Sequence, residues 1–185
     1  HLGKEKLWKM LLEFPSLQFG VEMAFLSLES ETSFLLFPSD FTTGKKNIPI
    51  NGLVWMGEPA FMKSQIEEKL AEGFHCIKLK IGAIDFEKEI GLLRLIRENY
   101  DDSTIEIRVD ANGGFTSSEA LFKLNQLSEF KIHSIEQPIQ KNQHDSMSEL
   151  CKNAPFPIAL DEELIGVFDY AQKEALLQKI RPQYI

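Results

Sequence analysis

The sequence has few of the features that mark secreted or membrane-spanning proteins. Its 185 residues include only two cysteines, Cys76 and Cys151, which lie far apart and lack metal-ligand spacing. No apolar run approaches the roughly 20 residues that span a bilayer, and residues 1–10 lack the layout of a signal peptide. We therefore expect a cytoplasmic protein with two reduced thiols.

Basic residues are also in the minority. Lys and Arg number 20 against 28 Asp and Glu, which gives a net charge of -8. Nucleic-acid binding requires a basic surface that neutralises phosphates, so this balance disfavours a nucleic-acid partner and, more weakly, an anionic membrane. The 43% hydrophobic and 26% charged residues are typical of a folded globular protein.

No glycine-rich dinucleotide fingerprint follows a predicted strand, and Gly113-Gly114 is too short a match. The chain does have a regular alternation of apolar strand patterns and amphipathic helix patterns, which repeats about every 25 to 28 residues. The predicted strands are 53–56, 75–82, 105–112, 133–138 and 157–163. This alternation predicts an α/β fold with parallel strands, either a doubly wound sheet or a (β/α) TIM-type barrel.

The predicted strands are not continuously apolar, as strands buried between two helical layers usually are. Side chains alternate between the two faces of a strand, so Ile77 and Leu79 share one face while Lys78 and Lys80 share the other. The other strands repeat this pattern. Over four strands the polar face carries a charge at or near the carboxyl end, on Lys78, Lys80, Asp110, Glu136 and Asp161.

In a barrel the carboxyl ends of all strands meet at one mouth, so these five side chains should lie close together. Buried charges are costly unless they neutralise one another or bind a metal. Three carboxylates without histidine or cysteine are hard oxygen ligands that suit Mg²⁺. The alternative is that Lys78 and Lys80 form interior salt bridges with Asp110 and Glu136.

Other polar residues support less specific interpretations. Glu106 and Arg108 lie lower on the same face, where an interior ion pair is expected. Glu162 has the opposite parity to Asp161, so it is either a polar residue facing the helices or a partner of a site residue. The three histidines without ligand spacing, for which we expect surface or hydrogen-bonded roles, are His75, His133 and His144.

Four short motifs at the ends of predicted strands resemble the enolase superfamily in its muconate-lactonising subgroup. They are KLKIG at 78–82, VDANGG at 109–114, IEQP at 135–138 and ALDEE at 159–163. The resemblance covers roughly residues 48–185, and the four motifs in this order are highly specific. Within the subgroup, segments such as PINGLVWMG and PIALDEELIG are most similar to the o-succinylbenzoate synthases.

The resemblance implies roles for individual residues. It implies an Mg²⁺ site, in which Mn²⁺ could substitute, on Asp110, Glu136 and Asp161. It also implies that Lys80 is the catalytic acid and base, with Lys78 as the supporting catalytic lysine. The resemblance further implies that Asn112 helps to order the site, and we assign Glu162 to the same group of site-ordering residues.

The resemblance also implies a domain organisation. Residues 1–47 would be the helical part of an N-terminal α+β capping domain with its linker, and 48–185 the first part of a barrel with about five strands. The sequence has no initiator Met and stops where a strand pattern starts, so we expect an incomplete fragment that lacks the later strands. A second catalytic lysine would lie beyond Ile185, and we expect the fragment alone to be inactive.

The implied activity is that of a hydro-lyase. An o-succinylbenzoate synthase dehydrates the cyclohexadiene carboxylate SHCHC to o-succinylbenzoate through an ene-diolate intermediate, in menaquinone biosynthesis. An amino-acid or dipeptide epimerase, or a muconate cycloisomerase, would share the metal ligands and Lys80. A non-catalytic α/β binding module with interior ion pairs is the alternative from a different class.

Overall fold

The computed structural model describes residues 2–32 and 35–185, which divide into two compact units. One unit comprises His1–Pro49 together with Phe168–Gln172, and the other comprises Ile50–Val167 together with Lys173–Ile185. Among the residues that the structure describes, only those of the second unit form a sheet. The assignment of the first unit to a capping domain remains a prediction.

The first unit is built on two short helices, α1 (Lys4–Met10) and α2 (Pro15–Glu29). Proline is favoured in the first turn of a helix because its missing N–H would have no partner there, and α2 begins with one. The buried Gln18 side chain donates a hydrogen bond to the carbonyl oxygen of Trp8, over 3.3 Å. This bond joins the two helices.

The second unit contains a sheet of five parallel strands in the described residues. They are β1 (Gly52–Val54), β2 (Cys76–Lys80), β3 (Glu106–Asp110), β4 (Ser134–Glu136) and β5 (Ile158–Ala159). Their order in space, β1-β2-β3-β4-β5, is their order in the sequence. A doubly wound sheet reverses its order at a switch point, whereas barrel strands follow one another around the ring. The order thus favours the barrel, and the predicted parallel α/β architecture is confirmed.

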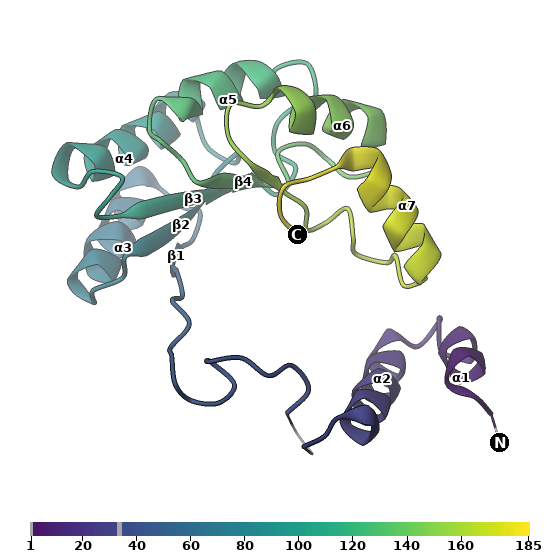
Figure 1. Ribbon diagram of the computed structural model, residues 1–185. Coiled ribbons are helices and arrows are strands. Elements are labelled where there is room, and N and C mark those ends of the chain that lie inside the picture. The colour runs from purple at the N-terminus through teal and green to yellow at the C-terminus, as the bar shows by residue number, and fades with distance from the viewer. Residues whose placement is uncertain (1, 33–34) are drawn as a thin grey trace. The chain divides into compact units, whose positions relative to one another are not determined.

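Helices follow the strands and cover one side of the sheet (Figure 1). They are α3 (Pro59–Ala71), α4 (Phe86–Asn99), α5 (Ala120–Ser128), α6 (His144–Asn153) and α7 (Tyr170–Ile180). In Figure 1, α3 to α6 form an arc along one face. Ile77, Leu79, Ile107 and Ile135 are at most 1% exposed and belong to the core, so the predicted apolar face of the strands is confirmed.

The start of α6 differs from the position that its local sequence pattern indicates. The spacing of Ser146 and Glu149 matches a capping box, but α6 begins at His144, so Ser146 lies inside the helix. The buried carboxylate of Glu163, from the segment after β5, accepts a hydrogen bond from the backbone N–H of Asn142 and lies 2.8 Å from His144 Nε2. This long-range contact fixes the start of the helix, and a local motif could not reveal it.

None of the helices found in residues 2–32 and 35–185 combines the length and the apolar character needed to cross a membrane.

Candidate active site

The sheet register places three of the predicted site residues at one level. Lys80 of β2 pairs with Asp110 of β3, which pairs with Glu136 of β4. The next residue in this row is Ala159 of β5. Lys78 lies one side-chain layer below, on the same polar face. The period-two pattern of the strands therefore brings these side chains to the carboxyl end of the sheet.

Four of the predicted residues are in direct contact, and we call Lys78, Lys80, Asp110 and Glu136 the carboxyl-end cluster. Lys78 Nζ lies 2.6 Å from Glu136 Oε2 and 3.2 Å from Asp110 Oδ2. Lys80 Nζ lies 2.5 Å from the same Asp110 oxygen. The interior salt bridges considered as an alternative are thus the contacts that the structure contains.

The electrostatic environment differs between the two carboxylates of this cluster. Burial raises the pKa of Asp110, but hydrogen bonds from Lys80 and the backbone N–H of Asn112 outweigh it, so the pKa falls below 3.8. Burial and the neighbouring Asp110 charge raise the pKa of Glu136 above 4.5, although Lys78 acts in the opposite direction. Burial lowers the pKa of Lys78, but Glu136 and Asp110 more than compensate, so its net shift is upward.

The fifth predicted residue, Asp161, stands apart. Its side chain is exposed, two residues beyond Ala159, and no described residue forms a hydrogen bond or ion pair with its carboxylate. Within the described part of the chain, no three His, Cys, Asp or Glu side chains are grouped so that they could hold a metal ion. The Asp110 and Glu136 carboxylates do fit a hard divalent cation, which would relieve their repulsion. The Asp161 carboxylate would have to turn towards them to complete the set.

The two residues predicted to order the site contact each other. Asn112 Nδ2 donates a hydrogen bond to Glu162 Oε1 over 2.8 Å, and its backbone N–H donates to Asp110 Oδ1 over 3.0 Å. Asn112 has a φ of 44°, in the left-handed region that Asn tolerates better than most residues. The buried Oε2 of Glu162 has no hydrogen-bond partner among the described residues. Of the two interpretations of Glu162, a partner of a site residue agrees with this contact.

The backbone behind the site is tightly packed at two glycines. A Cβ atom on Gly114 would lie 2.7 Å from the carbonyl oxygen of Gly82 and 2.9 Å from that of Ala111. Gly82 has a φ of +88°, which strongly favours glycine. The turns that follow Lys80 and Asp110 therefore touch through their backbones.

Two buried polar residues near the site were not predicted from the sequence. Glu89 of α4 accepts hydrogen bonds from the backbone N–H groups of Gly82, at 2.7 Å, and Ile84, at 3.4 Å. Gln137 follows Glu136 and is fully buried. A signal for Gln137 was present, because it shares strand parity with the apolar Ile135 and so is a polar residue at a core position.

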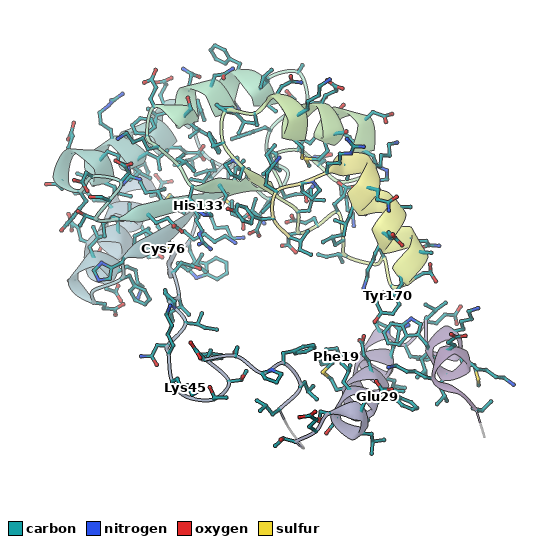
Figure 2. All side chains as sticks on the ribbon, in the orientation of Figure 1. Phe19, Glu29, Lys45, Cys76, His133 and Tyr170 are labelled. Carbon is teal, nitrogen blue, oxygen red and sulfur yellow. The ribbon has the colours of Figure 1, made fainter. Side chains whose placement is uncertain are left out.

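A second polar group lies nearer the amino ends of the strands, and we call Cys76, Glu106, Arg108 and His133 the amino-end cluster. Figure 2 labels two of its members, Cys76 at the start of β2 and His133 just before β4. Arg108 Nε lies 2.6 Å from Glu106 Oε1, so the expected ion pair forms, but its side chains are 44% and 37% exposed and the expected interior position is wrong. Cys76 Sγ donates to the same Glu106 oxygen over 3.5 Å. Burial raises the pKa of Cys76 to about 11.

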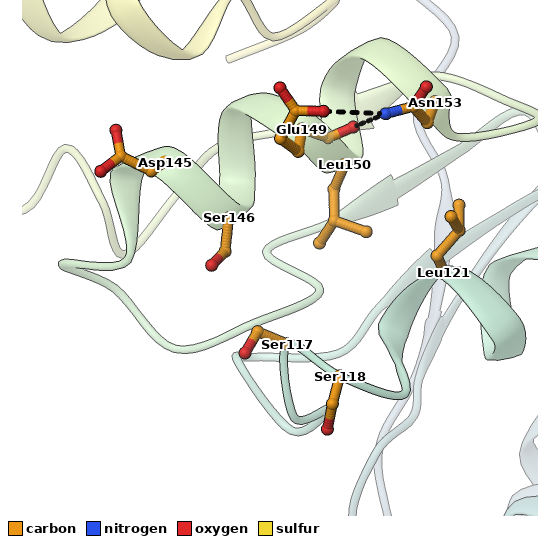
Figure 3. Close-up of a pocket in the computed structure, with 8 residues that line it drawn as sticks. All are labelled: Ser117, Ser118, Leu121, Asp145, Ser146, Glu149, Leu150 and Asn153. Carbon is orange, nitrogen blue, oxygen red and sulfur yellow. Dashed lines mark hydrogen bonds between the residues drawn. The ribbon is translucent and has the colours of Figure 1, made fainter.

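A surface pocket of about 430 Å³ lies away from both clusters, between the start of α5 and helix α6 (Figure 3). Its lining consists of Ser117, Ser118, Leu121, Asp145, Ser146, Glu149, Leu150 and Asn153. None of the predicted site residues contributes to it. The pocket is therefore separate from the predicted site.

The chain matches the sequence model of a known family over residues 62–176, and that family is described as enolase C-terminal domain-like. It is 58% identical over 172 residues to the o-succinylbenzoate synthase of Desulfotalea psychrophila. The aligned region covers 93% of this chain and 46% of that relative. The chain thus spans about half the length of that curated relative.

Solved structures agree with the sequence comparison. The crystal structure of MenC from Desulfotalea psychrophila LSv54 has a TM-score of 0.75 and 56% identity, over 93% of this chain and 47% of that one. A dipeptide epimerase from Cytophaga hutchinsonii, solved with Mg and the dipeptide D-Ala-L-Val, has a TM-score of 0.63 and 28% identity, over 72% of this chain and 35% of that one.

Proposed function

Since the chain belongs to the enolase C-terminal domain-like family, we propose that it forms part of an o-succinylbenzoate synthase. This enzyme would be a hydro-lyase that dehydrates SHCHC, 2-succinyl-6-hydroxy-2,4-cyclohexadiene-1-carboxylate, in menaquinone biosynthesis. The 58% identity to the Desulfotalea psychrophila synthase carries the proposal. The convergence of Lys80 with Asp110 and Glu136 at the strand ends supplies matching chemistry.

Asp110, Glu136 and Asp161 would hold Mg²⁺, or Mn²⁺ in its place. The Mg found with the dipeptide epimerase of Cytophaga hutchinsonii, a structural neighbour, supports this choice. When bound, the cation would act as a Lewis acid that stabilises negative charge on the substrate carboxylate. Without that stabilisation, a proton next to a carboxylate is too weakly acidic to be removed at a useful rate.

Lys80 would move the proton. Its Nζ lies within the carboxyl-end cluster and would accept the α-proton of the substrate. The C–O bond to the ring hydroxyl then breaks, the leaving hydroxide takes a proton from Lys80 Nζ, and water departs as the ring becomes aromatic. Lys78 would keep Asp110 and Glu136 in place through its two ion pairs. Asn112, held by Glu162, would orient Asp110.

The proposal is tested with the purified protein at its full natural length. SHCHC should be dehydrated in the presence of Mg²⁺, and activity should be lost with a chelator and return when Mg²⁺ is restored. Solvent-deuterium exchange into dipeptides is the matched assay for an epimerase. Exchange without dehydration would overturn the synthase assignment in favour of that alternative, whereas a muconate cycloisomerase would fail both assays.

A non-catalytic module is the second candidate, because the observed ion pairs of Lys78 and Lys80 satisfy the carboxylates without a metal. A ligand that binds only the folded state stabilises it by about 2.7 kcal/mol at a concentration of 100 times its Kd. Mg²⁺ should therefore raise the Tm of an enzyme and leave that of a module unchanged.

We further propose that the reaction takes place in the cytoplasm. Both cysteines, Cys76 and Cys151, are free thiols, as is usual in a reducing compartment. The substrate would be a small carboxylate.

A further inference from the structure

We propose that Gln137 is a positioning residue that fixes the three strand ends bearing Asp110, Glu136 and Asp161 relative to one another, so that these ends can hold a common divalent cation. This inference rests on the proposed metal site and goes beyond it, because Gln137 itself would not bind the metal. Its whole side chain is buried, and it follows Glu136 directly in the sequence.

The backbone of Gln137 joins the end of its own strand to both neighbours. Its carbonyl oxygen accepts a hydrogen bond of 2.7 Å from the N–H of Gly113, in the turn that follows Asp110. Its N–H donates a bond of 3.0 Å to the carbonyl oxygen of Ala159, just before Asp161. These bonds continue the sheet pairing for one residue beyond β4.

The side chain adds a connection that sheet pairing does not supply. Its Oε1 accepts hydrogen bonds from two backbone N–H groups after β5, those of Asp161 at 3.3 Å and Glu163 at 3.2 Å. The segment that carries Asp161 has already left the strand there, because β5 ends at Ala159. The Gln137 amide is therefore the group that holds the backbone of Asp161 beside the end of β4.

The other half of the amide is fixed as firmly. Its Nε2 donates to the carbonyl oxygen of Ile139 at 3.0 Å and to Glu163 Oε2 at 3.4 Å. The second oxygen of Glu163 accepts from the N–H of Asn142 at 2.8 Å and lies 2.8 Å from His144 Nε2. Only a primary amide offers an acceptor and a two-hydrogen donor at once, so a carboxylate or an apolar side chain cannot reproduce the set.

The backbone conformation indicates that this arrangement is enforced by its surroundings. Gln137 has a φ of 40°, in the left-handed region that is unfavourable for residues other than glycine, asparagine and aspartate. Such conformations persist where surrounding contacts over-determine them, and they are frequent at functional sites. Here the contacts are the six hydrogen bonds that the backbone and side chain of Gln137 form.

The experiment measures Mg²⁺ affinity by calorimetry in the protein at its full natural length, under conditions where each variant remains folded by circular dichroism. Gln137→Leu removes both halves of the amide and should weaken the Kd for Mg²⁺ by about 10- to 100-fold, the range typical of groups that orient metal ligands. Gln137→Glu keeps the acceptor but opposes the Glu163 carboxylate, so it should also weaken binding. The double variant Gln137→Glu/Glu163→Gln restores a donor facing residue 137 and should recover part of the loss.

Gln65 provides a matched control. Its side chain likewise bridges a backbone N–H and a carbonyl, those of Trp55 beyond the end of β1, with both distances 3.1 Å. No proposed metal ligand lies on β1. Gln65→Leu should therefore change the Kd for Mg²⁺ by less than about 2-fold, as expected for a substitution away from the site. Leu127→Ala creates a cavity beside helix α5 and is the control for effects on Mg²⁺ binding that come from a general loss of stability.

The outcomes separate the two proposals. If the wild-type protein does not bind Mg²⁺, the proposed metal site is wrong and this inference falls with it. If the wild type binds Mg²⁺ while Gln137→Leu binds it as tightly as Gln65→Leu does, Gln137 has only a structural role. A loss in Leu127→Ala equal to that in Gln137→Leu would lead to the same conclusion.

Discussion

The carboxyl-end cluster and the Arg108–Glu106 pair of the amino-end cluster lie on the same face of the sheet, yet they differ in how their charges meet. At the carboxyl end, Lys78 and Lys80 reach across strands to the fully buried Asp110. At the amino end, Arg108 pairs with Glu106 two residues away on its own strand, and their side chains remain 44% and 37% exposed. The alternation of side chains along a strand is enough to place both sets of charges on one face of the sheet, but it does not determine which charges pair.

This comparison indicates that a functional site is marked by charges that converge from several strands, more than by the presence of charge alone. In the carboxyl-end cluster two ammonium groups share one oxygen of Asp110, so removing that carboxylate leaves Lys80 without its ion-pair partner and takes one of two partners from Lys78. The Arg108–Glu106 pair can lose a member at little cost, because water replaces the lost partner. Substitutions at the two ends should therefore have unequal effects.

The largest contrast is expected in catalysis. Lys80→Ala removes the proposed base and should lower kcat by about 100- to 10,000-fold, the usual contribution of a general acid or base. Arg108→Ala, at the amino end, should change kcat by less than about 3-fold. Dehydration of SHCHC and Mg²⁺ binding are measured on the same samples. Substantial activity in Lys80→Ala, with Mg²⁺ binding retained, would contradict the assignment of the base.

Stability should show the next contrast. Asp110→Asn leaves Lys78 and Lys80 facing a neutral amide, and it should lower the free energy of unfolding by about 2–4 kcal/mol. This expected loss is smaller than that for breaking a fully buried ion pair, because the side chains of Lys78 and Lys80 are 21% and 16% exposed. Glu106→Gln should cost about 0–1 kcal/mol. Urea unfolding of both variants tests the difference, and equal losses would refute it.

Backbone packing should give a smaller effect. Gly114→Ala places a methyl group against the carbonyl oxygens of Gly82 and Ala111, so it should destabilise the fold by about 1–3 kcal/mol. Gly91→Ala, in helix α4 with open space around it, should stabilise by about 0.5–1 kcal/mol. Opposite shifts in Tm are expected, and a Gly114→Ala protein as stable as the wild type would show that the turns can move apart.

The smallest effect is a pH dependence of opposite sign at the two ends. Burial raises the pKa of Glu89, behind the carboxyl end, so its contribution to stability is present below pH 4.5 and is lost as the pH rises through the folded-state value. Burial also acts to raise the pKa of Glu106, but Arg108 outweighs it, so the pKa is lowered. That contribution is present above pH 4.5 and is lost as the pH falls through the folded-state value.

Unfolding free energies measured across this acid range should separate the two groups. Glu89→Gln should remove the decline in unfolding free energy that Glu89 causes as the pH rises above 4.5. Glu106→Gln should remove part of the loss of unfolding free energy that occurs as the pH falls below 4.5. High salt should weaken only the Glu106 effect, because exposed pairs are screened. If both substitutions changed the slope of unfolding free energy against pH in the same direction, the opposite pKa shifts assigned to Glu89 and Glu106 would be contradicted.

The strand pattern predicted much of this arrangement. The parity of residues 77 to 80 and 105 to 110 gave the buried and polar faces correctly, and the level of Lys80, Asp110 and Glu136 follows from parallel register. Asp161 was harder to place, because β5 ends at Ala159 and period-two reasoning stops where the strand does. The position of its side chain depends on a turn held by contacts from other segments.

The start of α6 and the roles of Glu89 and Glu163 depend on long-range contacts, which neither helix propensity nor strand parity encodes. Glu163 was part of the ALDEE motif without a role of its own, and its partner His144 lies 19 positions earlier. A polar residue at an apolar strand position, such as Gln137, is the signal of this kind that a single sequence does offer.

The two thiols offer a means of observing the sheet open. Burial raises the pKa of both Cys76 and Cys151 to about 11, so each thiol is far less ionised at neutral pH than it would be in the unfolded chain. An alkylating reagent reacts with the thiolate, so the folded chain resists labelling at both positions. Cys76 at the start of β2 and Cys151 in α6 would gain reactivity when the region around each opens, so labelling rates followed by mass spectrometry would report two separate openings without any engineered probe.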